Sequence, residues 1–81
     1  MGENLLNFIG DLITLIQERY NLTIDEPLNE SETDKAFRLG SNLAHYSDLD
    51  LIESQLSAYG IESKSFGVIT PVLGERLVRE K

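Results

Sequence analysis

Cysteine is absent from this 81-residue chain, and histidine occurs only once, at His45. Without thiols the chain forms neither disulfide bonds nor thiolate metal sites. A single imidazole also excludes a zinc site built from several histidines of one chain. We therefore expect no metal ion and no other cofactor in the protein.

Long apolar runs and a leader sequence are also missing. The apolar stretches cover only a few residues each, far fewer than the roughly 20 that a membrane-spanning helix needs. The N-terminus has no basic region followed by an apolar run and a small-residue cleavage site. These absences predict a cytoplasmic protein that does not bind a membrane.

Positive charge is scarce and unevenly placed. Seven bases stand against fourteen acids, which gives a net charge of −7. Residues 1–62 hold twelve of the acids and three of the bases, whereas residues 63–81 hold two acids and four bases. Binding to nucleic acid needs clustered lysine and arginine, so this distribution argues against direct contact with nucleic acid. It suits a basic protein surface better.

Motifs that carry chemistry are equally absent. The chain has no Gly-x-Ser-x-Gly elbow for a nucleophilic serine, no phosphate-binding loop and no dinucleotide fingerprint. Paired carboxylates that act as acid and base need a cleft that separates their pKa values, and a domain of this size has little room for one. The sequence therefore predicts a protein that is not an enzyme.

The spacing of apolar residues predicts an all-α fold. We expect a small antiparallel bundle of three helices plus a weaker C-terminal helix, forming a single helical domain over residues 1–81. The expected helices cover residues 3–20, 31–46, 48–59 and 70–80, and an acidic loop covers residues 21–30.

Capping residues mark the start of the second and third expected helices. The second begins with either Asn29 and Glu32 or Ser31 and Asp34, since both pairs have the spacing of a capping box. The third follows Ser47, a residue type that is favoured at a helix N-cap.

Glycine and proline mark the later boundaries. Gly60 is suited to the left-handed conformation that ends a helix, after which Ile61 folds back onto the last turn. Thr70 then caps the last expected helix, and Pro71 occupies its first position.

The first expected helix is apolar over about half of its circumference. At about 100° per residue, one half-circle holds Leu5, Leu6, Phe8, Ile9, Leu12, Ile13, Leu15, Ile16 and Tyr20. A surface helix needs an apolar stripe only a little wider than about 100°, so apolar surface remains for a partner molecule. We therefore expect a non-enzymatic protein-interaction module that forms a homodimer. Its interface candidates are Leu5, Phe8, Leu12, Leu15 and Tyr20.

A second function is open, in which the protein is an acidic inhibitor or a nucleic-acid mimic. It would occupy the basic surface of a regulator, nuclease or toxin, and its binding would weaken as salt is added. The candidate acids are Asp25, Glu26, Glu30, Glu32, Asp34, Asp48, Asp50 and Glu53.

Two further alternatives depend on the sequence around Ser47. The helices expected on either side of it outline a helix-turn-helix, but the second carries only acidic charges and would be repelled by phosphates. Ser47-Asp48-Leu49 in a small acidic helical chain resembles the attachment site of acyl carrier proteins, which reads Asp-Ser-Leu and holds phosphopantetheine on its serine. Here the serine precedes the aspartate, so a small carrier or enzyme is the least favoured function.

Overall fold

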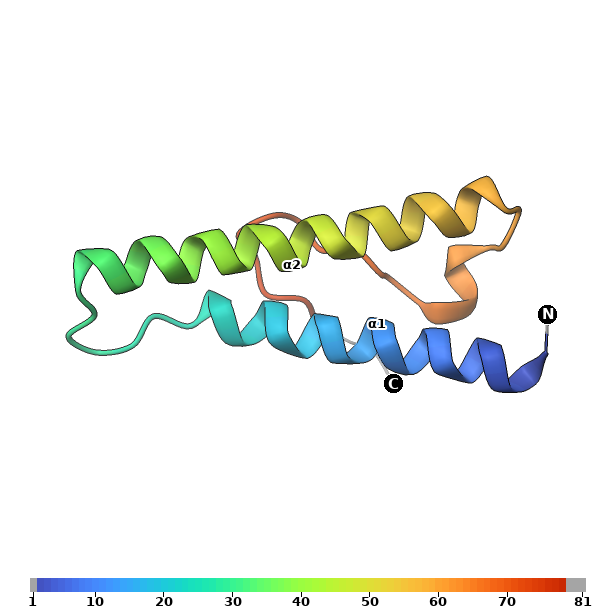
Figure 1. Ribbon diagram of the computed structural model, residues 1–81, viewed down its shortest axis with the longest axis horizontal. Helices are drawn as coiled ribbons and strands as arrows, with labels where there is room; N and C mark the ends of the chain where they lie inside the picture. Colours follow the sequence, from blue (N-terminus) through green and yellow to red (C-terminus); the bar gives the residue numbers. More distant parts are fainter. Residues whose placement is uncertain (1, 79–81) are drawn as a thin grey trace.

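Two long helices and one short one make up the regular structure of the chain. A computed structural model describes residues 2–78. It contains the α-helices α1 (Glu3–Ile24) and α2 (Glu32–Ala58) and the 3-10 helix η1 (Ser63–Phe66). The two α-helices lie side by side and run in opposite directions, and the chain after η1 returns along them (Figure 1). The all-α class is confirmed, because these residues contain no strand.

The predicted number of helices is wrong. Residues 31–46 and 48–59 do not form two helices, because α2 runs without a break from Glu32 to Ala58 and Ser47 lies inside it. No glycine or proline stands near the expected break. The buried residues of α2, Asn42, Leu49 and Leu56, recur every seven positions across it. That spacing keeps one continuous helix in contact with α1 from Asn42 to Leu56.

The predicted boundaries of the first helix and of the acidic loop are also wrong. α1 extends to Ile24 instead of residue 20, so residues 21–24 of the expected loop are helical. Ile24 packs against the core and Asn21 binds the chain near its C-terminal end, which gives the extra turn tertiary support. Pro27 lies in the remaining connection, and a proline disfavours helix in the residue before it.

Arg38 of α2 holds the connection between the helices in place. Its Nη1 donates to the Thr23 carbonyl at 3.0 Å and to the Ile24 carbonyl at 3.5 Å. Its Nε and Nη2 donate to the Glu30 carboxylate at 2.8 and 3.1 Å. The last carbonyls of a helix lack partners inside the helix and carry partial negative charge, so the guanidinium is a suitable cap for α1.

Two other helix ends are capped as the sequence predicts. The Ser31 hydroxyl accepts from the Asp34 amide at 3.0 Å, which decides between the two possible caps of α2. At the other end of α2, Gly60 has a φ of 75° and the Ile61 amide donates to the Leu56 carbonyl at 2.8 Å. This is the hydrogen bond of a Schellman motif, and Ile61 packs against the core.

The predicted helix over residues 70–80 is wrong for residues 70–78, and residues 79 and 80 lie outside the described residues. We call residues 67–78 the C-terminal segment; it is not helical and contains one turn. In this turn the Glu75 amide donates to the Val72 carbonyl at 2.9 Å, and Gly74 has a φ of 88°. A glycine with positive φ at the third position is typical of a type II turn. Pro71 is buried instead of starting a helix.

Polar side chains of α1 bind the first half of the C-terminal segment. Gln17, which is buried, donates from Nε2 to the carbonyls of Val68 at 2.9 Å and Ile69 at 3.2 Å. Nearby, a Cβ atom on Gly10 would lie at an ordinary contact distance of 3.7 Å from Cδ1 of Phe66, so η1 packs beside α1 at this position. The expected polar half of α1 is therefore partly covered by the chain itself.

The second half of the segment is held by Tyr20 and Asn21. The Tyr20 hydroxyl donates to the Glu75 carbonyl at 2.6 Å and accepts from the Gly74 amide at 3.2 Å. Asn21 exchanges two hydrogen bonds of 2.9 Å with the backbone of Leu77. These bonds satisfy backbone groups that a helix would have paired internally, so the segment is stable without being helical.

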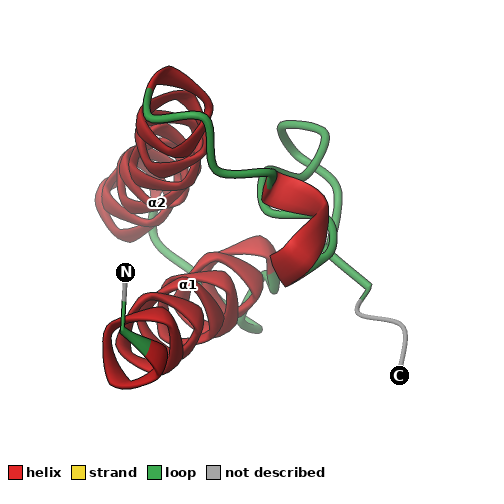
Figure 2. Ribbon diagram, turned by 90° about the vertical axis from the view of Figure 1, so that its right-hand side faces the viewer, coloured by secondary structure: helices red, strands yellow, loops and turns green. Residues whose placement is uncertain are grey.

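The core lies where the two helices and the C-terminal segment meet. Its buried residues are Ile13 and Tyr20 of α1, Leu49 and Leu56 of α2, and Ile69 of the C-terminal segment. Viewed from one end, η1 and the C-terminal segment lie together on one side of the helix pair (Figure 2). The chain thus forms a helical hairpin that is covered on one side only.

Replacing Tyr20 by Phe should destabilise the protein by about 1–2 kcal/mol, because the substitution keeps the buried ring but leaves the Gly74 amide and the Glu75 carbonyl without their partner. Urea unfolding measures the loss. The matched control is Tyr59→Phe, since Tyr59 is 80% exposed. Equal stability of both variants and the unmodified protein would show that the hydroxyl does not hold the segment.

Candidate functional site

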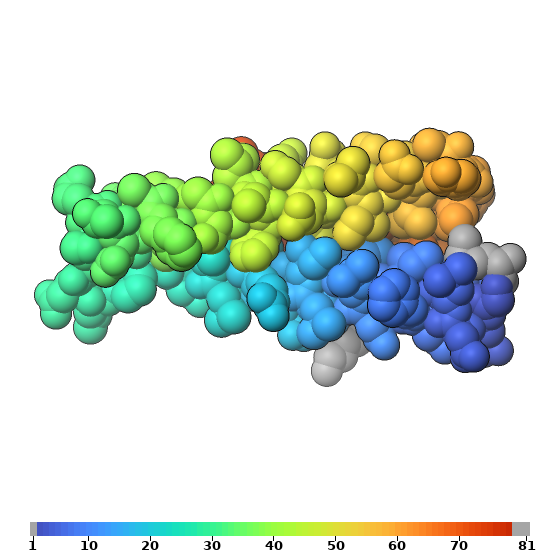
Figure 3. All heavy atoms as spheres, viewed as in Figure 1, coloured from blue at the N-terminus to red at the C-terminus, as the bar shows by residue number. Residues whose placement is uncertain are grey.

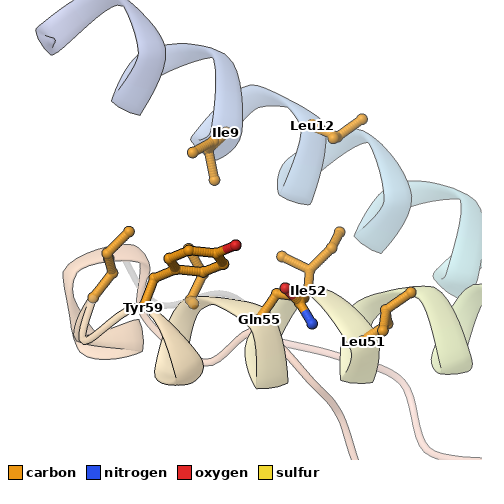
Figure 4. A pocket seen from close by; sticks show the side chains of 8 residues that line it. Ile9, Leu12, Leu51, Ile52, Gln55 and Tyr59 are labelled. Carbon is orange, nitrogen blue, oxygen red and sulfur yellow. The ribbon is translucent and has the colours of Figure 1, made fainter. Parts of the chain in front are cut away.

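The side of the hairpin opposite the C-terminal segment carries an apolar groove. The groove has a volume of about 760 Å³ and is lined by Ile9, Leu12, Leu51, Ile52, Gln55, Leu56, Tyr59 and Ile61. Figure 4 shows the side chain of Ile9 of α1 pointing across it toward the ring of Tyr59, the residue that follows α2. In the space-filling view of this side, α1 and α2 form the surface and the C-terminal segment is almost hidden behind them (Figure 3).

On α1 the apolar surface continues along the helix beyond the groove. Leu5, Phe8, Leu12 and Leu15 are between 40% and 60% exposed. Their spacing of three and four residues, which Arg19 and Leu22 continue, places them on one stripe of the helix. α1 therefore has two such stripes, one packed against α2 and one exposed.

On α2 a matching stripe borders the groove from the other side. It contains Ala44, Asp48, Leu51 and Gln55 of α2 and continues to the C-cap residue Tyr59, and these residues also follow one another by three or four positions. We call the groove and these two stripes the open face. The open face can bind an apolar helix or a second protein surface, because it is long, shallow and mostly apolar.

Four of the five predicted interface residues lie on the open face, and the fifth does not. Tyr20 is fully buried, seven residues after Ile13, and its hydroxyl binds the C-terminal segment. The sequence prediction did not include Leu51 of α2 or Tyr59, which follows α2. In the sequence, Leu51 lies off the apolar stripe formed by Leu49, Ile52 and Leu56, and this was the available signal for Leu51.

Charge is sparse on the open face although the chain carries −7. The charged members of its stripes are Arg19 on α1 and Asp48 on α2, and both are exposed. Neither takes part in an ion pair within residues 2–78. Asp11 and Glu18 of α1 adjoin its exposed stripe, each three residues after one member and four before another. The stripes themselves therefore hold one charge of each sign.

The acids predicted for the connection and for the start of α2 are not brought together as one free anionic surface. Glu30 is paired with Arg38, and Asp25 is paired with Arg76 of the C-terminal segment. Glu26 is exposed in the connection. Glu32 and Asp34 lie in the first turn of α2, where acids interact favourably with the helix dipole.

The remaining predicted acids point in different directions around α2. Asp48 lies on the open face, whereas Asp50 is on the opposite flank of the helix by its position in the turn. Glu53 is half-buried and lines a small pocket with Ser63 and the start of the C-terminal segment. The structure thus distributes these eight acids over several surfaces.

The Glu30 carboxylate has a defined electrostatic environment. Its side chain is 5% exposed and that of Arg38 is 12% exposed. The hydrogen bonds from Arg38 lower the pKa of Glu30 below its ordinary value, and the positive charge of Arg38 acts in the same direction. The charged form of Glu30 therefore stabilises the fold. It forms an ion pair with Arg38, and Arg38 also caps α1.

Residues 2–78 contain no group of three or more acidic or histidine side chains that could hold a metal ion, and His45 is half-buried on α2. Over the same part of the chain, neither α-helix combines the length and the apolar character needed to cross a bilayer.

Comparisons of the chain with protein-family models, curated proteins and solved structures found no match.

Acid should weaken the protein partly through Glu30. Because the folded-state pKa of this group is lowered, its stabilisation is complete above the ordinary pKa of about 4.5 and is lost as the pH falls through the lowered value. Glu30→Gln should lower the stability at pH 7 and make its dependence on pH below 4.5 shallower. Urea midpoints measured across this range test the expectation. The exposed Glu18→Gln should keep the steeper dependence, and identical curves for all three proteins would contradict it.

Proposed function

We propose that this protein is a non-enzymatic protein-interaction module that forms a homodimer through the open face. The proposal rests on one observation: the chain covers one side of its helical hairpin with its own C-terminal segment and leaves an apolar groove along the other. Following the sequence composition, we place the dimer in the cytoplasm.

The accessible surface supports a missing partner. The chain exposes 6077 Å², whereas folded monomers of its mass expose roughly 4,900 Å². The difference, roughly 1,200 Å², exceeds the roughly 800 Å² that each partner buries in a standard interface. The shape agrees, because the radius of gyration is 14.2 Å and a globular chain of this length has about 12 Å.

The distribution of charge allows a second copy to be the partner. Two molecules that each carry −7 repel one another at long range. With Arg19 and Asp48 as the charged groups of the stripes, two open faces can meet while most of the acids stay in solvent. Added salt screens the long-range repulsion, so the dimer should persist at high salt, unlike a complex with a basic protein.

The acidic-mimic function has less support. It needs acids that are free and gathered on one surface, but Asp25 and Glu30 are each paired with an arginine of the same chain. The other candidates lie on separate surfaces of α2 and the connection.

Light scattering after size-exclusion chromatography, at about 0.1 M and 0.5 M salt, should give twice the chain mass at both concentrations. Leu15→Glu should shift the mass toward that of one chain, because it buries a charge in the interface. Leu43→Glu is the matched control, since Leu43 is 51% exposed and Leu15 is 55% exposed, but Leu43 lies on the other flank of α2. Circular dichroism should show both variants folded. A monomeric unmodified protein would overturn the proposal.

A further inference from the structure

A dimer through the open face can be built with its two-fold axis in either of two directions. An axis perpendicular to the helices places α1 on α1 of the partner and α2 on α2 of the partner. An axis parallel to the helices places α1 on α2 of the partner instead. Both arrangements are four-helix bundles in which neighbouring helices are antiparallel.

The register of the hairpin shows which charges would meet in each arrangement. The Asn42 side chain donates to the Tyr20 carbonyl at 3.2 Å, so residues 42 and 20 lie at the same height along the hairpin. With a rise of about 1.5 Å per residue, Asp48 lies level with residue 14, near the middle of the overlap between α1 and α2. Arg19 lies about 7–8 Å further along the same axis.

The perpendicular axis brings like charges together. When this axis passes through the middle of the overlap, where the two hairpins share the longest contact, it places Asp48 opposite Asp48 of the partner subunit in an apolar interface. Facing charges of the same sign disfavour such an interface strongly.

The parallel axis brings opposite charges together. It preserves height along the bundle, so Arg19 comes within about 7–8 Å along the axis of Asp48 of the partner subunit, a distance that an arginine side chain spans. The pair forms twice in the dimer. The small Ala44, four residues before Asp48, leaves space for the arginine.

We infer that two copies of this chain form a four-helix bundle in which α1 of each copy packs on α2 of the other, with Arg19 facing Asp48 of the partner subunit. The inference rests on the proposed homodimer and adds its orientation. In this bundle Leu12, which lies across the groove from Leu51 in its own chain, also meets Leu51 of the partner subunit at nearly the same height.

Exchanging the two charges tests the pair directly. Arg19→Asp places two acids at each contact, and Asp48→Arg places two arginines there, so each variant alone should dimerise at least ~10-fold more weakly than the unmodified protein. An equimolar mixture of the two variants should dimerise again, because each chain supplies the charge that the other needs at both contacts. An Arg19→Asp variant that dimerises as tightly as the unmodified protein would overturn the inference.

Cross-linking tests the orientation independently of these charges. The chain has no cysteine of its own, so an introduced cysteine is the only thiol in each variant. Single-cysteine variants Leu12→Cys and Leu51→Cys, one of them carrying a mass tag, are mixed and mildly oxidised. The inferred bundle gives the mixed disulfide as the main product, and Leu15→Cys alone gives little.

The opposite pattern, with Leu15→Cys linking to itself and no mixed product, would show the perpendicular arrangement and overturn the inference while leaving the homodimer in place. A monomer in light scattering would instead remove the proposed function itself, so the two failures are distinguishable.

Discussion

Two helices packed side by side share a single line of contact, and a groove remains along each side of that line. Neither groove can be covered by the helices themselves, since each helix buries only the stripe that faces the other. In this protein the C-terminal segment fills one groove, while the other stays open and apolar. The long exposed surface and the elongated shape both follow from this constraint.

The filled groove requires polar side chains in places where a bundle would use apolar ones. An extended segment that runs beside helices has no neighbouring strand to pair with, so its backbone must be satisfied by side chains. Gln17, Tyr20 and Asn21 provide these bonds from successive turns of α1. The buried Asn42 adds a bond between the helices themselves, from its amide to the Tyr20 carbonyl. Polar residues thereby determine how the three parts of the chain fit together.

The helical class, the caps at Ser31 and Gly60 and the surplus apolar surface of α1 could all be predicted from the sequence, because each depends on neighbours within a few residues. The continuity of α2 could not, since Ser47 has the same capping chemistry whether or not a helix breaks there. The helix is continuous because the residues that contact α1 recur every seven positions on both sides of Ser47. The non-helical conformation of the C-terminal segment could not be predicted for a related reason. The side chains that bind its backbone lie more than fifty residues earlier in the sequence.

The α2 half of the open face was missed for a similar reason. Leu51 and Tyr59 are exposed like many single apolar residues, and the position of Leu51 off the core stripe does not show which residues of α1 lie beside it. They become part of a continuous surface only when the hairpin places them beside Leu12 and Ile9. A surface shared by two helices is visible in the sequence only after the register between the helices is known.

The order in which the two grooves become available has a consequence for assembly. The bonds of the C-terminal segment join residues 51 to 56 positions apart, whereas the Asn42 bond between the helices spans 22. Distant contacts form later in folding, because closing a longer loop costs more chain entropy. Before the segment docks, both sides of the hairpin expose apolar surface. A protein with two such sides can associate with a copy on each side and form open-ended assemblies. In the proposed homodimer, docking of the segment leaves one such side, so the position of the segment would also stop growth at a pair.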